Sequence, residues 1–174
     1  RRFRRLRNHG MERSGAGRVS REAGSNSRLT NLQSALGRAQ LPCLDDWLVA
    51  RRELAHSYHH ALEALAASDV ARPTPCEGHS WQTYMVVLAS WLDRDAVIKA
   101  MAADGIEVNL GAQCLSELPS FQGLVVADDD MRHAQRLYRQ GLALPFCEQY
   151  GSIEVDRVVA ALSSAIECQR GASR

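Results

Sequence analysis

Three histidines, His56, His59 and His60, lie within five positions of one another in this chain. The spacing of His56 and His60 places two imidazoles on one face of a helix, where they can bind a metal ion. No carboxylate or third ligand accompanies the pair at ligand spacing. The pattern therefore favours solvated surface histidines, and we expect no metal site.

Cysteine chemistry has little support in the sequence. The chain has five cysteines, an odd number, and they form no C-x-x-C pair and no Cys/His cluster with zinc spacing. We expect reduced cysteines in a cytoplasmic protein. The chain also has no glycine-rich phosphate loop and no G-x-S-x-G elbow. From spacing alone, the sequence predicts a domain without an evident active site.

The basic residues are almost all arginine, since Lys99 is the single lysine among 21 basic side chains. Lys99 lies inside the helical pattern DAVIKAMAA, which predicts a solvated helix lysine. Eight arginines fall within residues 1–21. They could contact phosphates or form the solvated end of a helix from another domain. The spacing of Phe3 and Leu6 favours the helix, so we expect no nucleic-acid binding.

Length and composition set broad limits. A chain of 174 residues with a net charge of +1 and 45% hydrophobic residues suits one soluble domain, or one domain with an appendage. No apolar run approaches the ~20 residues that cross a bilayer. The basic start is followed by glycine and serine, unlike a signal peptide. Because the sequence opens on arginine, we expect it to come from a longer chain.

Two helices are predicted in the first half of the chain. Thr30 and Gln33 have the spacing of a capping box, and the helix they start, 30–41, has an apolar face that ends at Pro42. A second helix, 45–66, starts at Asp45 or Asp46. The apolar face of the first helix comprises Leu29, Leu32, Leu36 and Ala39, and the buried side of the second comprises Trp47, Leu48, Leu54, Tyr58, Leu62 and Leu65.

The remaining pattern predicts a small sheet packed on helices, an α/β or α+β fold. Strands are expected at 80–89, covered on both faces, and at 106–110 and 142–145. Further helices are expected at 94–103, capped by Gly105, at 130–140, with Asp128, Asp129 and Asp130 on its first turn, and at 153–167. Residues 14–25, 68–79 and 111–126 are expected to be loops or linkers.

One long segment adds a stronger signal. GSNSRLTNLQSALGRAQL, residues 24–41, resembles the start of the C-terminal region of the DegT/DnrJ/EryC1/StrS aminotransferases. The resemblance continues in order through LRNHGM (6–11), HSWQTYMVVL (79–88), DRDAVIKAMAADGIEV (93–108) and GLALPF (141–146). It covers nearly the whole chain.

The resemblance implies the small C-terminal domain of the aspartate-aminotransferase (type I) fold. It divides the chain into the end of the large domain with a connecting arm (1–25), linking helices (26–67) and the small domain (68–174). Enzymes of this family use pyridoxal 5'-phosphate and mostly act on nucleotide-linked keto-sugars. The resemblance also implies a homodimer with shared active sites. The cofactor lysine belongs to the large domain, and Lys99 cannot replace it.

The resemblance assigns roles to three residues. Asn26 matches an asparagine that contacts the cofactor phosphate from the neighbouring subunit, and Arg28 matches an arginine on the substrate side. Ser116 stands where the family often has a histidine near the sugar. Gly111 replaces a frequent tyrosine, and Cys147 replaces a frequent histidine. These departures indicate a specialised or decayed sugar pocket, so substrate identity does not carry over.

Two alternatives remain open at this point. Some family members are dehydratases that carry histidine in place of the cofactor lysine, and that position lies outside the matched segments. A non-catalytic remnant, or a regulatory module that binds through its arginine arm, is the third possibility.

Overall fold

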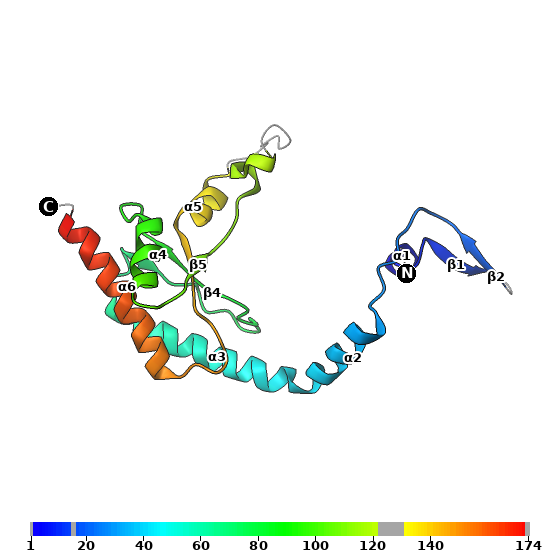
Figure 1. Cartoon of the computed structure of the whole chain (residues 1–174), viewed down its shortest axis with the longest axis horizontal. Coiled ribbons are helices and arrows are strands. Elements are labelled where there is room, and N and C mark those ends of the chain that lie inside the picture. Colours follow the sequence, from blue (N-terminus) through cyan, green and yellow to red (C-terminus); the bar gives the residue numbers. More distant parts are fainter. Residues whose placement is uncertain (1, 15–16, 122–130, 173–174) are drawn as a thin grey trace. The chain divides into compact units, whose positions relative to one another are not determined.

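The computed structural model describes residues 2–14, 17–121 and 131–172. The chain divides into two compact units, one of residues 1–45 and one of residues 46–174. Figure 1 shows the helices and strands of both units.

The first unit contains a short helix, a hairpin and a longer helix. Helix α1 (Arg2–Leu6) precedes strands β1 (Met11–Ser14) and β2 (Gly17–Ser20), which pair antiparallel with Met11 opposite Ser20. The expectation of a loop over 14–25 was therefore wrong for residues 17–20. Strand β2 is exposed along its whole length, so it lacks the apolar alternation by which a half-buried strand is recognised.

Helix α2 (Asn31–Gln40) confirms the predicted capping box. The backbone N–H of Gln33 donates to Thr30 Oγ1, and that of Thr30 donates to Gln33 Oε1 at 2.9 Å. Its apolar face is not buried: Leu32 is 81% exposed and Leu36 is 59% exposed. The periodicity predicted the helix correctly, but nothing within the described part of this unit covers the face.

Helix α2 ends before Pro42, as predicted. A single 3₁₀ turn (Leu41–Cys43) holds Pro42 at its start, and α3 (Leu44–Ala61) follows directly, continued by a 3₁₀ turn at Leu62–Ala64. Of the side chains expected on its inner side, Leu54, Tyr58 and Leu62 are buried, whereas Trp47, Leu48 and Leu65 are half-buried.

The second unit is built on a four-stranded antiparallel sheet in the order β3-β4-β6-β5. Its strands are β3 (Val70–Ala71), β4 (Tyr84–Leu88), β5 (Asn109–Leu110) and β6 (Gly141–Leu144). Strand β3 lies in the segment expected to be a linker, and β5 is shorter than predicted. Along β4, Tyr84, Val86 and Leu88 are fully buried while Met85 and Val87 are half-buried. One face is thus covered better than the other, not both equally as expected.

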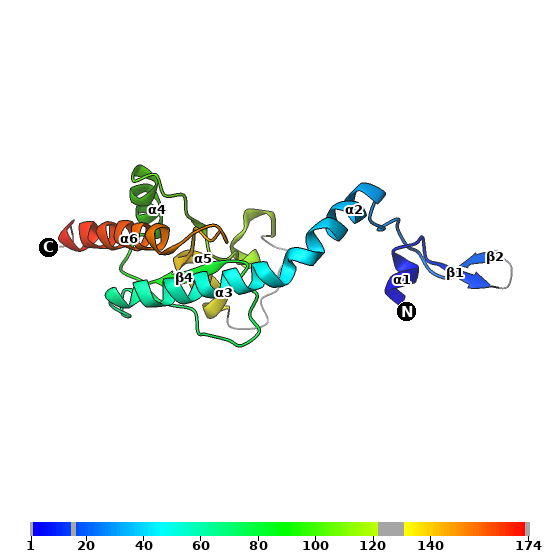
Figure 2. The same cartoon turned by 90° about the horizontal axis from the view of Figure 1, so that it is seen from below.

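The helices of this unit agree with the predicted pattern. They are α4 (Arg94–Ala103), α5 (Arg132–Gln140) and α6 (Ser152–Ala172), and α4 and α6 lie side by side (Figures 1 and 2). Gly105 ends α4 with φ of +73°, as a C-terminal cap requires. Two 3₁₀ turns, Leu115–Glu117 and Pro119–Phe121, interrupt the expected loop. The predicted acidic first turn at Asp128–Asp130 lies outside the described residues.

Aromatic side chains form the centre of the core. The rings of Tyr58 and Tyr84 stack with centroids 5.0 Å apart, and Phe146 stacks against both. The Tyr58 hydroxyl donates to the carbonyl of Pro145 at 2.7 Å, which ties α3 to the segment after β6. Burial raises the pKa of both tyrosine phenols well above the usual value, because a buried phenolate loses its hydration.

Across the described residues, no helix combines the length and the apolar character that crossing a membrane requires.

The core predicts a large difference between two positions of α6. Leu162 is fully buried, whereas Ile153 is 78% exposed. Leu162→Ala should lower the free energy of unfolding by about 2–5 kcal/mol through lost burial and a residual cavity. Ile153→Ala, the control, should change it by less than about 0.5 kcal/mol. Denaturant unfolding measures both, and equal effects would contradict the assigned core.

The raised phenol pKa values predict a loss of stability in alkali. Unfolded tyrosines lose their protons near pH ~10, whereas Tyr58 and Tyr84 stay protonated to higher pH in the folded chain. The unfolded state therefore binds fewer protons above that pH, and stability should fall as pH rises. Tyr84→Phe should reduce this fall. Ultraviolet absorbance of phenolate in the folded chain, compared with denatured chain, gives the titration; coincident curves would refute the prediction.

Candidate functional site

The loop that carries Asn26 and Arg28 is fastened to the start of the chain by backbone hydrogen bonds. The Ser25 N–H donates to the Leu6 carbonyl at 2.9 Å, and the Ser27 N–H donates to the Arg7 carbonyl at 3.0 Å. The His9 N–H donates back to Ser25 at 3.0 Å. Asn26 itself forms an isolated antiparallel bridge with Asn8. These bonds hold the backbone around Asn26 against residues 6–9.

Two glycines let these segments approach each other. A Cβ on Gly24 would lie 2.3 Å from the backbone nitrogen of Gly10 and 2.6 Å from the Leu6 carbonyl oxygen. A Cβ on Gly10 would lie 1.7 Å from the Glu22 carbonyl oxygen, and Gly10 also has φ of +68°. Only glycine fits at either position. The glycine that precedes Asn26 in the sequence is therefore required for packing.

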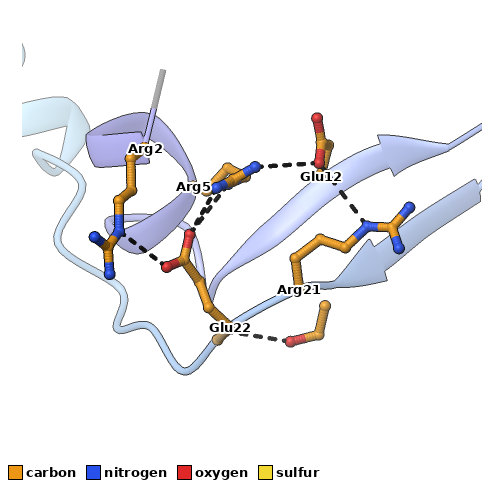
Figure 3. A network of polar contacts seen from close by, with 6 residues as sticks. Arg2, Arg5, Glu12, Arg21 and Glu22 are labelled. Atoms are coloured by element: carbon orange, nitrogen blue, oxygen red, sulfur yellow. Dashed lines mark hydrogen bonds and ion pairs between the residues drawn. The ribbon is translucent and has the colours of Figure 1, made fainter.

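An ion-pair network joins α1, strand β1 and the residues that follow β2 (Figure 3). Arg5 lies between two carboxylates, with Nη2 3.0 Å from Glu22 and Nη1 3.3 Å from Glu12. Arg2 also pairs with Glu22, and Arg21 with Glu12. Three of the arginines in the predicted basic arm are thus held by glutamates of this unit and fix α1 against the hairpin.

Asn26 and Arg28 lie on the exposed part of this loop and contact each other. The Arg28 Nε donates to Asn26 Oδ1 at 3.1 Å. Because the amide oxygen is occupied in this way, the amide N–H₂ group of Asn26 is left as a donor, and no acceptor for it lies among the described residues. The remaining guanidinium N–H groups of Arg28 are donors too. The pair therefore presents hydrogen-bond donors and one positive charge to an anion.

Ser116 lies in the second unit, so the structure does not place it together with Asn26 and Arg28. It is half-buried in the turn Leu115–Glu117, and its hydroxyl is 3.1 Å from the thiol of the buried Cys114. Gly111 fits against Met85, whose Cγ and Sδ would lie 2.5 Å from an added Cβ. The backbone carbonyl carbon of Gly141 would lie 2.9 Å from the same Cβ, so a larger residue at position 111 requires these neighbours to shift.

Lys99 is exposed on α4, where the sequence predicted a solvated helix lysine. His56 and His60 are exposed on α3, and His60 contacts Glu63 at 3.4 Å. Over the described ranges, no group of three metal-ligating side chains comes together.

His59 departs from the prediction of a surface histidine. Its Nδ1 is 2.5 Å from the Tyr84 hydroxyl, and its ring meets Trp81 and Tyr84 edge-on. Helical spacing does distinguish it, because Ala55, Tyr58 and Leu62 of the same buried face lie within four positions of it. The expectation treated the three histidines as one group and missed that face.

The model of the DegT/DnrJ/EryC1/StrS aminotransferase family matches residues 1–163. The chain belongs to this family. Its fold is accordingly that of the pyridoxal-phosphate aminotransferases, and the resemblance drawn from the segments between residues 6 and 146 is confirmed.

Curated relatives include nucleotide-sugar enzymes of the DegT/DnrJ/EryC1/StrS family. A GDP-perosamine synthase of Caulobacter vibrioides is 34% identical over 82% of this chain, which spans 39% of that protein. A dTDP-3-amino-3,4,6-trideoxy-alpha-D-glucose transaminase of Micromonospora megalomicea is 30% identical over 94% of this chain and 44% of its own length. The chain thus spans less than half of the relatives it matches.

Solved structures agree in fold with this DegT/DnrJ/EryC1/StrS chain. DesV of S. venezuelae superposes with a TM-score of 0.78 at 27% identity, over 94% of this chain and 43% of DesV. Helicobacter pylori PseC, an aminotransferase involved in the biosynthesis of pseudoaminic acid, superposes with a TM-score of 0.80 at 18% identity, over 95% of this chain and 45% of PseC. At that identity the second likeness shows the fold alone.

The family cofactor, pyridoxal 5'-phosphate, fits the donor set of the Asn26 loop at its phosphate end. A phosphate needs hydrogen-bond donors and positive charge, and the free amide N–H₂ of Asn26 and the Arg28 guanidinium provide both. The nearest glutamates in sequence, Glu22 and Glu12, are neutralised by arginines. The aldehyde end needs an amine, and Lys99 is the one lysine of the sequence.

The close packing of Gly24 predicts a specific effect of substitution. Gly24→Ala should open the loop and destabilise the first unit by roughly 1–3 kcal/mol, because the new Cβ meets backbone atoms. Gly37→Ala is the control: its Cβ meets nothing within 4 Å on helix α2, and it should stabilise by roughly 0.5–1 kcal/mol. Amide hydrogen exchange at Ser25 and Ser27 measures the loop directly. Unchanged protection in Gly24→Ala would contradict this packing.

Proposed function

We propose that this chain is the C-terminal part of a pyridoxal-phosphate-dependent aminotransferase that acts on a nucleotide-linked keto-sugar. The family match over residues 1–163 carries the proposal. It is supported by relatives whose names specify GDP- and dTDP-linked sugars. When bound, the cofactor supplies the carbonyl group that carries nitrogen from an amino donor to the sugar.

In this proposal Asn26 binds the cofactor phosphate through its free amide N–H₂ group. A fixed loop suits that task, because a donor held by backbone hydrogen bonds loses little further freedom on binding. Arg28 stands beside it and binds the anionic nucleotide-sugar through its remaining guanidinium N–H groups. Ser116, at the family's sugar-side histidine position, contacts the sugar as a hydroxyl that can donate or accept.

The proposed assembly is a homodimer in which Asn26 and Arg28 complete the partner's site. The exposed apolar face of α2 supports an interface on this side of the chain, because Leu29, Leu32 and Leu36 are 71%, 81% and 59% exposed. Contiguous apolar surface of this kind is typical of interaction sites. A two-fold axis would repeat the contact and complete two sites from one loop sequence.

The first expected outcome concerns the chain by itself. Amino transfer needs a lysine amine beside the cofactor carbonyl, and Lys99 is a solvated residue of α4. Chain mixed with pyridoxal 5'-phosphate should give no borohydride-reducible adduct at a unique, stoichiometric position, as measured by peptide mass analysis. Specific labelling of Lys99 together with amino-transfer activity would overturn this expectation.

The second expected outcome concerns Asn26 and Arg28 in an enzyme that contains the cofactor lysine. A hydrogen bond to a charged group is worth roughly 1.5–3 kcal/mol, so Asn26→Ala should raise the cofactor Kd about 10- to 150-fold. Arg28→Ala should mainly raise KM for the nucleotide-sugar. Cofactor titration and steady-state kinetics measure the two effects. An unchanged cofactor Kd in Asn26→Ala would remove that residue from the site.

Mixed dimers test the cross-subunit assignment. Asn26→Ala chains are combined with chains whose cofactor lysine is replaced. If Asn26 acts on the partner, both defects fall in one site and the other site stays whole, so activity returns. If it acts within its own chain, each site has one defect, and activity stays low when the assay is run at cofactor concentrations below the raised Kd. Loss of activity in mixed dimers verified by mass would refute the assignment.

A further inference from the structure

The second unit has a cavity of about 320 Å³ between α3 and the segment that leads into β4. Arg52, Ala55, His56 and His59 line it from one face of α3, at the spacing that brings residues of successive helical turns together. Residues 75–77 and Trp81 form the opposite wall. None of the residues assigned above to cofactor or substrate lines this cavity.

Two opposite charges face this cavity without meeting. Arg52 comes from α3 and Glu77 from the facing segment. Neither side chain has a hydrogen bond or ion pair within the part of the chain that the structure describes. The neighbouring Arg51, in contrast, pairs with Glu148 at 3.4 Å and donates to the Trp81 carbonyl. The space between them suits a ligand that carries both an anionic and a cationic group. Its anionic group would face Arg52 and its cationic group would face Glu77.

The walls of the cavity show two further features that independently indicate a site. Trp81 has φ of +50°, a left-handed conformation that a bulky residue adopts only at a cost and that recurs at binding sites. His59 Nε2 is buried and has no hydrogen-bond partner among the described residues. If Tyr84 donates its hydroxyl proton to Nδ1, Nε2 carries the ring proton and is a donor without an acceptor.

We propose that this cavity binds a free α-amino acid with an apolar side chain. The carboxylate lies on the α3 side, against the guanidinium of Arg52 and the imidazole of His56. The ammonium group lies against Glu77. Ala55, Pro75 and the Trp81 ring supply apolar surface for the side chain. This binding uses neither the cofactor nor the Asn26 loop, so its test is independent of the proposed aminotransferase function.

Three small molecules separate the charges in the test. L-Phenylalanine carries both charges, 3-phenylpropanoate lacks the ammonium group, and 2-phenylethylamine lacks the carboxylate. Each is titrated into the 174-residue chain at neutral pH by calorimetry, with L-leucine in parallel as a smaller amino acid. Amide chemical shifts of residues 52–59 and 75–81 locate the binding. We expect the two amino acids to bind roughly tenfold or more tightly than either singly charged molecule.

Charge-removing variants then give effects of opposite sign. Glu77→Gln should weaken L-phenylalanine roughly tenfold and strengthen 3-phenylpropanoate, because the repulsive carboxylate is gone. Arg52→Gln should weaken L-phenylalanine similarly and strengthen 2-phenylethylamine. Glu53→Gln is the control, since Glu53 is exposed on α3 but does not line the cavity. Circular dichroism verifies that each variant is folded.

The outcomes are decisive in both directions. Saturable amino-acid binding with these opposite effects supports the site. Absence of saturable binding of both amino acids overturns it. The site is also overturned if 3-phenylpropanoate and 2-phenylethylamine bind as tightly as the amino acids. It is overturned as well if Glu77→Gln and Arg52→Gln weaken the binding of all three phenyl compounds by the same factor. An equal effect of Glu53→Gln would also overturn it, because the binding would then follow overall charge.

Discussion

The first unit depends on the close approach of two backbone segments, residues 6–10 and 24–27. Backbone hydrogen bonds join these two segments. The segments lie so close together that a Cβ atom at Gly10 or Gly24 would overlap backbone atoms. The positions of the ion-pair network and of the Asn26–Arg28 pair depend on this close approach. The ion pairs of Arg5 with Glu12 and Glu22 stabilise the same contact. The backbone hydrogen bonds of Ser25 and Ser27 position Asn26, whose side chain accepts a hydrogen bond from Arg28.

The second unit is organised by a different kind of interaction, the packing of aromatic rings on strand β4. Tyr84 contacts Tyr58 and Phe146 by stacking, and its hydroxyl contacts His59. One strand thereby joins α3, the segment after β6 and the wall of the cavity.

Much of this fold could be predicted because its signals are local. The capping box at Thr30, the cap at Gly105 and the apolar spacing of α6 each depend on residues within a few positions of one another. Strand β2 was missed because its four residues are all exposed and show no apolar alternation, although its partner β1 is close in sequence. Strand β3 was missed because it has two residues and pairs with β4, which is distant in sequence. Of the candidate site, Asn26 and Arg28 were predicted from the family resemblance. Their mutual hydrogen bond and the contact of His59 with Tyr84 depend on three-dimensional packing.

The near absence of lysine has a practical consequence for labelling. Lys99 is the single lysine of the chain and is exposed on α4, while the other 20 basic side chains are arginines, which do not react with amine-directed reagents. Among side chains, a fluorophore or spin label carrying an active ester will therefore attach to Lys99 in the second unit and to none in the first; the α-amino group of the chain also reacts with such esters. A label on Lys99 reports on the surroundings of α4. Replacing the exposed Cys76 and Cys168 and the half-buried Cys147 would leave Cys43 as the accessible thiol for a second, thiol-directed probe in the first unit.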